Sequence, residues 1–189
     1  MPRLFTGIEI PDDIRAELAR LRQPLPGARW IEPEDYHITL RFAGDIDNKA
    51  AAEFADALSE IDVPTFELRF SGMGAFGGNE PRSLWAGLEP NPDLDALARA
   101  NERAARKSGL QPETRKFKPH VTIARLKNTS VDVVARYLQK FGGFRTRPFT
   151  VSRFVLFSSK PQVGGGPYVI ESVYTLQGGQ YAEFEDEYR

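Results

Sequence analysis

The chain has two histidines in 189 residues, and each opens the same pattern of histidine, aliphatic residue, threonine and aliphatic residue. The patterns are HITL at residues 37–40 and HVTI at residues 120–123, here called the first and the second tetrad. Successive side chains of a strand point to opposite faces. A tetrad in a strand therefore presents an imidazole and a hydroxyl on one face and two aliphatic side chains on the other.

Two imidazoles that face each other across a cleft can act as a general acid and a general base, because imidazole changes charge near neutral pH. This pairing suits an in-line displacement at phosphorus, in which one histidine takes a proton from the attacking oxygen and the other gives one to the leaving oxygen. The hydroxyls of Thr39 and Thr122 would hydrogen-bond the non-bridging oxygens, on which charge builds. The residues require one acid and one base, and leave open whether His37 or His120 has each role.

A metal site is the competing interpretation of two histidines. Zinc in a catalytic site takes three protein ligands, and two histidines leave the third ligand to be supplied by a carboxylate. A single strand histidine is also often structural, and it is the repetition of the whole pattern that favours function. We therefore expect catalysis without a metal or another cofactor.

Composition narrows the possible classes of protein. A hydrophobic content of 41% can fill a core, and a net charge of −1 argues against a large non-specific nucleic-acid platform. The chain has no run of about 18 apolar residues, so no transmembrane helix is predicted. The first residues have the pattern of a strand and not that of a signal peptide. The chain has no cysteine, which excludes disulfides and thiolate chemistry. We expect a cytoplasmic protein.

Hydrophobic periodicity predicts an α+β fold. Strands are expected at 3–10, 36–43, 65–71, 83–88, 120–126, 148–158 and 168–176, and helices after Pro11 and at 48–61, 93–108 and 131–141, with an interstrand loop over 72–81. The second half repeats the order of elements of the first, and the tetrads lie 83 residues apart (120 − 37).

This repetition predicts two pseudo-symmetric lobes, each a mainly antiparallel sheet with helices on its outer face. Each lobe would present one tetrad to an active-site cleft between the lobes. We expect residues 1–177 to form a single bilobal domain, and the acidic tail 178–189 to fray.

Paired His-x-Thr-x tetrads about half a chain apart resemble those of the two-histidine phosphoesterase superfamily. Longer stretches are similar to the bacterial and archaeal RNA 2′,3′-cyclic phosphodiesterases, also called 2′-5′ RNA ligases. The similar stretches are RLFTGI at 3–8, HITLRFAG at 37–44, PHVTIAR at 119–125, LFSS at 156–159, and Tyr168 with YTL at 174–176.

The resemblance implies a bilobal fold and the metal-independent hydrolysis of a terminal RNA 2′,3′-cyclic phosphate to a 2′-phosphate, with 2′-5′ ligation as the reverse reaction. It implies that His37 donates a proton to the leaving 3′ oxygen and that His120 accepts one from water. The expected partners are RNA ends or nucleotides that carry a cyclic phosphate, with no membrane. No protein partner is implied, and we expect a monomer.

Three further residues are candidates for substrate binding. Alternation places Arg41 on the tetrad face, but it places Arg125 and Phe42, each five residues past its histidine, on the opposite face. The resemblance implies that Arg125 and Phe42 line the pocket, with Phe42 stacking on the terminal base. That arrangement needs strand twist, a bulge or a strand end. Arg41 and Arg125 compete for the role of binding the phosphate.

Two other functions stay open at this point. A non-catalytic RNA-binding or nucleotide-binding module would keep the fold, although the presence of both histidines argues against it. A two-histidine phosphodiesterase could also act on another cyclic phosphate, such as an ADP-ribose cyclic phosphate. The geometric requirement for catalysis is that both His-Thr pairs face one cleft, reached by Arg41 or Arg125.

Overall fold

The computed structural model describes residues 3–159 and 166–177. The strands are β1 (Arg3–Glu9), β2 (Ala28–Trp30), β3 (His37–Asp45), β4 (Phe66–Leu68), β5 (Phe70–Phe76), β6 (Ser83–Leu88), β7 (His120–Leu126), β8 (Phe149–Val151), β9 (Arg153–Ser159) and β10 (Val169–Thr175). The helices are α1 (Asp12–Ala19), α2 (Asn48–Ser59), α3 (Pro92–Lys107) and α4 (Val131–Phe141), with a 3₁₀ turn, η1 (Pro33–Asp35).

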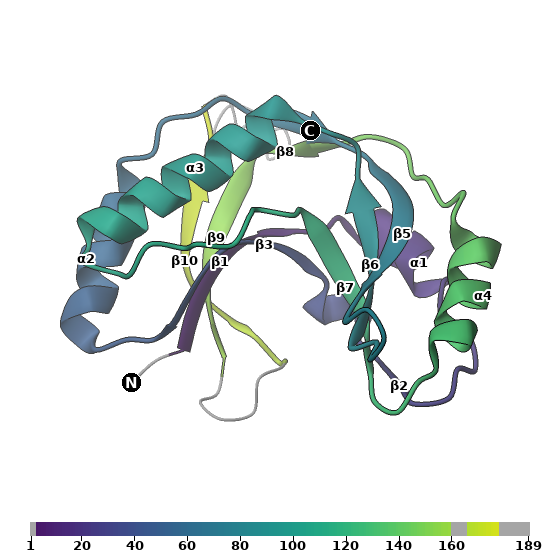
Figure 1. Cartoon of the computed structure of the whole chain (residues 1–189). Coiled ribbons are helices and arrows are strands. Elements are labelled where there is room, and N and C mark those ends of the chain that lie inside the picture. The colour runs from purple at the N-terminus through teal and green to yellow at the C-terminus, as the bar shows by residue number, and fades with distance from the viewer. Residues whose placement is uncertain (1–2, 160–165, 178–189) are drawn as a thin grey trace.

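The strands form two antiparallel four-stranded sheets (Figure 1). The first sheet has the order β10-β9-β1-β3, the second has the order β2-β7-β6-β5, and β4 and β8 form a small separate ribbon. The first tetrad opens β3 and the second opens β7, so each sheet carries one tetrad, and the two strands contact each other. The α+β fold with antiparallel sheets is confirmed.

The helices lie outside the sheets (Figure 1). α2 packs against α3, and these helices contact β10 and β3 of the first sheet, whereas α4 contacts β5 of the second. The hydroxyl of Tyr137 in α4 donates to the carbonyl of Leu21, just past α1, which joins these two helices. Ser130 caps α4, since its side chain accepts from the N–H of Val133. Among the described residues, no helix combines the length and the apolar character needed to cross a bilayer.

The sheets do not correspond to the two halves of the chain. The first sheet combines β1 and β3 from the N-terminal quarter with β9 and β10 from the C-terminal end, and β2, β5, β6 and β7 form the second. One hydrophobic core contains Ile38 of β3 and Val121 of β7, both fully buried. Strands from both halves of the chain thus contribute to each sheet, and each sheet presents one tetrad. The acidic tail 178–189 lies outside the described residues.

The loop expected over residues 72–81 is wrong in its first part, because β5 continues to Phe76. Gly74 of β5 pairs with Trp85 of β6, and the indole lies across it. A Cβ atom at Gly74 would lie 2.2 Å from the Trp85 ring. Gly74, one of the glycines that indicated a loop, therefore allows a close approach within a sheet. The expected strand at 65–71 is divided between β4 and β5, and the short β2 was not predicted.

Candidate active site

The same backbone contact holds both tetrad histidines. Nδ1 of His37 lies 2.9 Å from the carbonyl oxygen of Asp35, and Nδ1 of His120 lies 2.6 Å from that of Lys118, in each case two residues earlier. A carbonyl only accepts, so Nδ1 carries the hydrogen in both rings. Nε2 is then the atom that exchanges a proton. In the neutral His37 ring it accepts from the Thr39 hydroxyl at 3.0 Å.

Aromatic side chains surround His37. Its ring centroid lies 4.9 Å from that of Phe5 and 5.7 Å from that of Phe157, and the Tyr168 ring meets it edge-on at 5.1 Å. Burial lowers the pKa of His37 from 6.5 to about 4, although the Asp35 carbonyl favours the charged ring. The free protein therefore holds His37 neutral at pH 7.

His120 has a similar environment on the second sheet. Phe76 meets its ring edge-on with the centroids 4.9 Å apart, and the Trp85 ring lies at 5.8 Å. The Lys118 ammonium lies over both aromatic rings, 5.3 Å from the Phe76 centroid and 5.1 Å from the Trp85 centroid. Burial lowers the pKa of His120, and the charges of Lys118 and Arg125 lower it further, against the Lys118 carbonyl. Phe76 and Trp85 were not predicted as neighbours of His120; the sequence signal for Trp85 was Gly74, which makes room for its ring.

Electrostatic coupling shows that the two histidines share one environment. Besides burial, the charges of His120 and Arg125 lower the pKa of His37. The charge of Arg125 also lowers the pKa of His120. Since β3 and β7 contact each other, the fold brings both tetrads and Arg125 to one place.

A β-bulge in β3 changes which side chains share the face of the first tetrad. The pairing with β1 passes from Gly7 opposite Thr39 to Thr6 opposite Arg41, so Leu40 is an extra residue in the ladder. Leu40 and Arg41 are consequently both buried. Phe42 returns to the tetrad face with 39% of its surface exposed.

β7 contains a bulge at the matching position. The pairing with β6 passes from Trp85 opposite Thr122 to Leu84 opposite Ala124, so Ile123 is the extra residue. Ile123 and the next residue are both buried, and Arg125 is exposed on the tetrad face. Both bulges fall on the fourth residue of a tetrad. Each strand thus contains a bulge of the kind that would place Phe42 and Arg125 on the same face as the histidines.

The predicted position of Arg41 is wrong. Alternation predicted that it shares the face of His37, but the bulge at Leu40 turns it into the protein. Its guanidinium is bonded to the Glu102 carboxylate at 2.5 Å and to the carbonyls of Phe42 and Gln111, each also at 2.5 Å. With 8% of its surface exposed, Arg41 ties β3 to α3 and to the segment before β7. The expectation that it competes with Arg125 for the phosphate is wrong.

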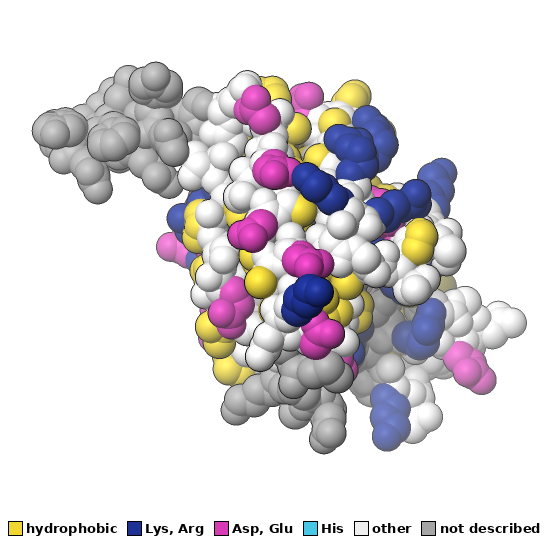
Figure 2. Space-filling view, turned by 90° about the vertical axis from the view of Figure 1, so that its left-hand side faces the viewer, with side chains coloured by type: hydrophobic (Ala, Val, Ile, Leu, Met, Phe, Trp, Pro, Cys, Tyr) yellow, Lys and Arg dark blue, Asp and Glu magenta, His cyan; other side chains and the backbone are white. Residues whose placement is uncertain are grey.

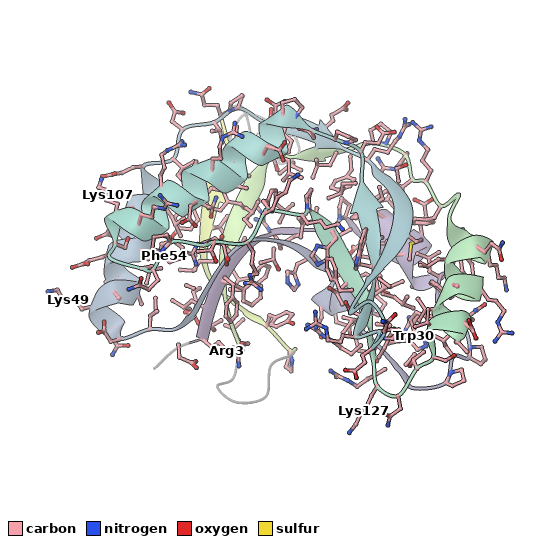
Figure 3. All side chains as sticks on the ribbon, viewed as in Figure 1. Arg3, Trp30, Lys49, Phe54, Lys107 and Lys127 are labelled. Atoms are coloured by element: carbon pink, nitrogen blue, oxygen red, sulfur yellow. The ribbon has the colours of Figure 1, made fainter. Side chains whose placement is uncertain are left out.

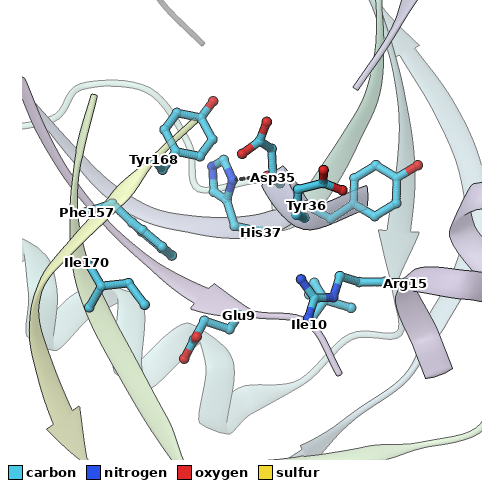
Figure 4. A pocket seen from close by; sticks show the side chains of 10 residues that line it. Glu9, Ile10, Arg15, Asp35, Tyr36, His37, Phe157, Tyr168 and Ile170 are labelled. Carbon is cyan, nitrogen blue, oxygen red and sulfur yellow. Dashed lines mark hydrogen bonds between the residues drawn. The ribbon is translucent and has the colours of Figure 1, made fainter. Parts of the chain in front are cut away.

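A cavity of about 270 Å³ adjoins His37 (Figure 4). His37 and Tyr168 line one part of it, and Glu9 and Arg15 line another. His120 does not line it, so this cavity extends away from the second tetrad. Within residues 3–159 and 166–177, no group of three or more histidine, aspartate and glutamate side chains is arranged to hold a metal ion.

Known proteins are similar to this chain in sequence and in fold. The family model described as LigT like Phosphoesterase matches residues 8–85 and 88–168. The RNA 2′,3′-cyclic phosphodiesterase of Archaeoglobus fulgidus is 30% identical over 167 residues, which cover 84% of this chain and 94% of the relative. The protein of the same name from Aquifex aeolicus is 30% identical over 185 residues, 93% of this chain and 98% of the relative.

A solved structure is also similar over nearly the whole chain. The crystal structure of E. coli LigT complexed with 3′-AMP superposes with a TM-score of 0.77 at 25% sequence identity, covering 93% of this chain and 99% of that one. The family model and the fold thus agree. This chain belongs to the LigT-like phosphoesterase family, within the two-histidine phosphoesterase superfamily.

Proposed function

We propose that this protein is an RNA 2′,3′-cyclic phosphodiesterase, which hydrolyses a terminal cyclic phosphate to a 2′-phosphate without a metal ion. The observation that carries the proposal is the matched pair of histidines, each with Nδ1 bonded to a backbone carbonyl and Nε2 left for proton transfer. Curated relatives named for this activity support the choice of substrate. We place the reaction in the cytoplasm and expect a monomer.

In the proposed mechanism, water attacks phosphorus while Nε2 of His120 takes a proton from it. The bond from phosphorus to the 3′ oxygen breaks, and protonated His37 gives its Nε2 proton to that oxygen. The hydroxyls of Thr39 and Thr122 and the guanidinium of Arg125 stabilise charge on the non-bridging oxygens. The same groups acting in reverse would join RNA ends through a 2′-5′ linkage.

The low pKa of His37 in the free protein sets a condition on this mechanism. A donor must carry its proton when the substrate is bound, and a nearby negative charge raises the pKa of an imidazole. The phosphate therefore supplies the charge that protonates His37. Phe42, exposed on the same face, stacks on the terminal base in this proposal.

The experiment that tests the activity offers 2′,3′-cyclic mononucleotides and a short RNA with a cyclic phosphate end, and identifies the product as a 2′- or a 3′-phosphate. We expect a 2′-phosphate, unchanged turnover in a chelator, and loss of turnover in His37→Ala and in His120→Ala while both variants stay folded. Binding without turnover would instead indicate a non-catalytic module. Loss of activity in the chelator would contradict the metal-independent mechanism.

A second experiment assigns the acid and the base. In a substrate whose leaving 3′ oxygen is replaced by sulfur, the leaving group needs no proton. We expect the loss of rate in His37→Ala to become at least tenfold smaller with this substrate, whereas the loss in His120→Ala stays the same. Rescue of His120→Ala in place of His37→Ala would reverse the proposed roles.

A further inference from the structure

Two arginines lie directly opposite each other in the second sheet. Arg29 of β2 pairs with Arg125 of β7, and both side chains are exposed. Residues opposite each other in antiparallel strands have Cβ atoms about 5 Å apart on the same face, where like charges are destabilising. Within the part of the chain that the structure describes, neither guanidinium forms an ion pair with a carboxylate. Among the described residues, the pair is therefore a double positive charge without a salt-bridge partner.

The pair points into the active site rather than away from it. The bulge in β7 returns Arg125 to the face of His120, and Arg29 shares that face because it lies opposite Arg125. Its neighbour Trp30 points the other way and contacts Tyr137 of α4, as strand alternation requires. Arg29 therefore extends the tetrad face of the second sheet by one strand.

The Tyr168 hydroxyl connects the pair to the first sheet. Burial raises the pKa of Tyr168 and the charge of Asp35 raises it further, whereas the charges of Arg125, Arg29 and Arg3 lower it. One carboxylate and three guanidinium groups therefore act on this phenol. The Tyr168 ring packs edge-on against His37. Arg3 also lies over the Phe42 ring, 5.4 Å from its centroid. The group of arginines thus lies next to Tyr168, which packs against His37.

The positive charge here is local. The chain has a net charge of −1, and the face on the α2 side carries both acidic and basic side chains (Figure 2). Arg3, at the start of β1, and Lys127, just after β7, both lie on the lower side of the molecule as drawn in Figure 3. A negatively charged chain that left the site on this side would meet further cations.

We propose that Arg29 is a specificity-determining residue, which binds the phosphodiester 5′ to the terminal nucleotide while Arg125 binds the cyclic phosphate. Two side chains that start about 5 Å apart can each reach one of two successive phosphates of a strand. The enzyme then prefers RNA ends to free cyclic mononucleotides, which have no second phosphate. This inference rests on the function proposed above and adds the basis of substrate selection.

The test compares a cyclic mononucleotide with a dinucleotide that has one phosphodiester and a cyclic phosphate end. For Arg29→Gln we expect the ratio of kcat/KM for the dinucleotide to that for the mononucleotide to fall about tenfold, the effect of losing one charge-assisted hydrogen bond. Arg29→Lys should recover part of the ratio. Arg136→Gln, an exposed change on α4, is the matched control and should leave the ratio unchanged.

Two further readouts separate this role from a structural one. The slope of log kcat/KM against log salt for the dinucleotide should become shallower by about 0.7 in Arg29→Gln, as for one lost phosphate contact on a single strand. The variant should unfold at the same or a higher urea concentration than the wild type, because it relieves the repulsion from Arg125. An equal loss on both substrates, or no loss on either, would overturn the proposal.

Calorimetry distinguishes failure of this inference from failure of the proposed activity. The probes are a dinucleotide with a terminal 2′-phosphate and the corresponding nucleoside 2′-phosphate, neither of which needs turnover. Arg29→Gln should weaken binding of the dinucleotide about tenfold more than binding of the mononucleotide. That result would support the subsite even if the cyclic substrates were not hydrolysed, and equal weakening would contradict it.

Discussion

His37 shows how the surroundings of one residue set the pH range in which the protein is stable. Because burial lowers its pKa from 6.5 to about 4, folding favours the neutral ring. The stabilising contribution is fully present above pH 6.5, and it is lost as the pH falls to 4, since the unfolded chain takes up the proton first. A shift of this size corresponds to about 3 kcal/mol.

Urea unfolding of the wild type and of His37→Gln between pH 7.5 and pH 4 measures this contribution. We expect the free energy of unfolding of the wild type to fall more steeply below pH 6.5 than that of the variant. Carboxylates titrate in both proteins, so the difference between the two curves isolates His37. Parallel curves would contradict the assigned environment.

Arg41 and Arg125 have opposite roles although both follow a tetrad. Arg41→Gln removes a buried ion pair with Glu102 and should lower the free energy of unfolding by about 2–4 kcal/mol. Arg125→Gln removes an exposed charge and should leave stability within about 0.5 kcal/mol while lowering kcat/KM at least tenfold. Urea unfolding and steady-state kinetics of both variants check this. The opposite assignment of effects would show that the bulge positions are wrong.

At the scale of the elements, the bulge in each tetrad strand brings a third candidate side chain to the tetrad face. If the two strands alternated regularly, with no bulge at Leu40 or Ile123, Phe42 and Arg125 would point into the core and Arg41 would share the face of His37. The bulges thus make an aromatic ring and a guanidinium available, one on each strand.

The contact between β5 and β6 is a second feature at this scale. In Gly74→Ala, the new methyl group would overlap the Trp85 ring, which packs against His120. We expect a loss of about 1–3 kcal/mol of stability, a shift of the tryptophan emission, and reduced kcat. Gly143→Ala is the control, because no atom lies within 4 Å of the added carbon there. Wild-type emission and activity in Gly74→Ala would contradict the packing described.

At the scale of the whole molecule, the larger of two hydrophobic clusters spans the two sheets and predicts a cooperative unfolding transition. Both tryptophans, Trp30 and Trp85, belong to the second sheet, so their fluorescence reports on that sheet, whereas far-UV circular dichroism reports on the whole chain. The two urea curves should coincide. In Ile38→Ala, a cavity in the first sheet should cost about 2–5 kcal/mol and shift both curves equally. A fluorescence curve that stays in place would show that the lobes unfold independently.

Much of this arrangement was predictable from the sequence, because it depends on local patterns. Period-2 alternation identified the tetrad strands, and helical periodicity with the Ser130 cap identified α4 with its bounds. The repeated His-x-Thr pattern identified both histidines. Their Nδ1 atoms bond the carbonyls of Asp35 and Lys118, each only two residues earlier in the chain.

Tertiary structure decided the features that depend on distant strands. A bulge is defined by the partner strand, so pairing with β1 and β6, and not the tetrad sequence, set the directions of Arg41 and Arg125. The aromatic neighbours that lower the pKa of His37 come from β1, from β9 and from the residue before β10. The repeated tetrad pattern was enough to propose the two histidines and the two threonines as the reacting groups. Only the folded chain decided which of their neighbours face the same site, because strand pairing and burial join residues more than a hundred positions apart.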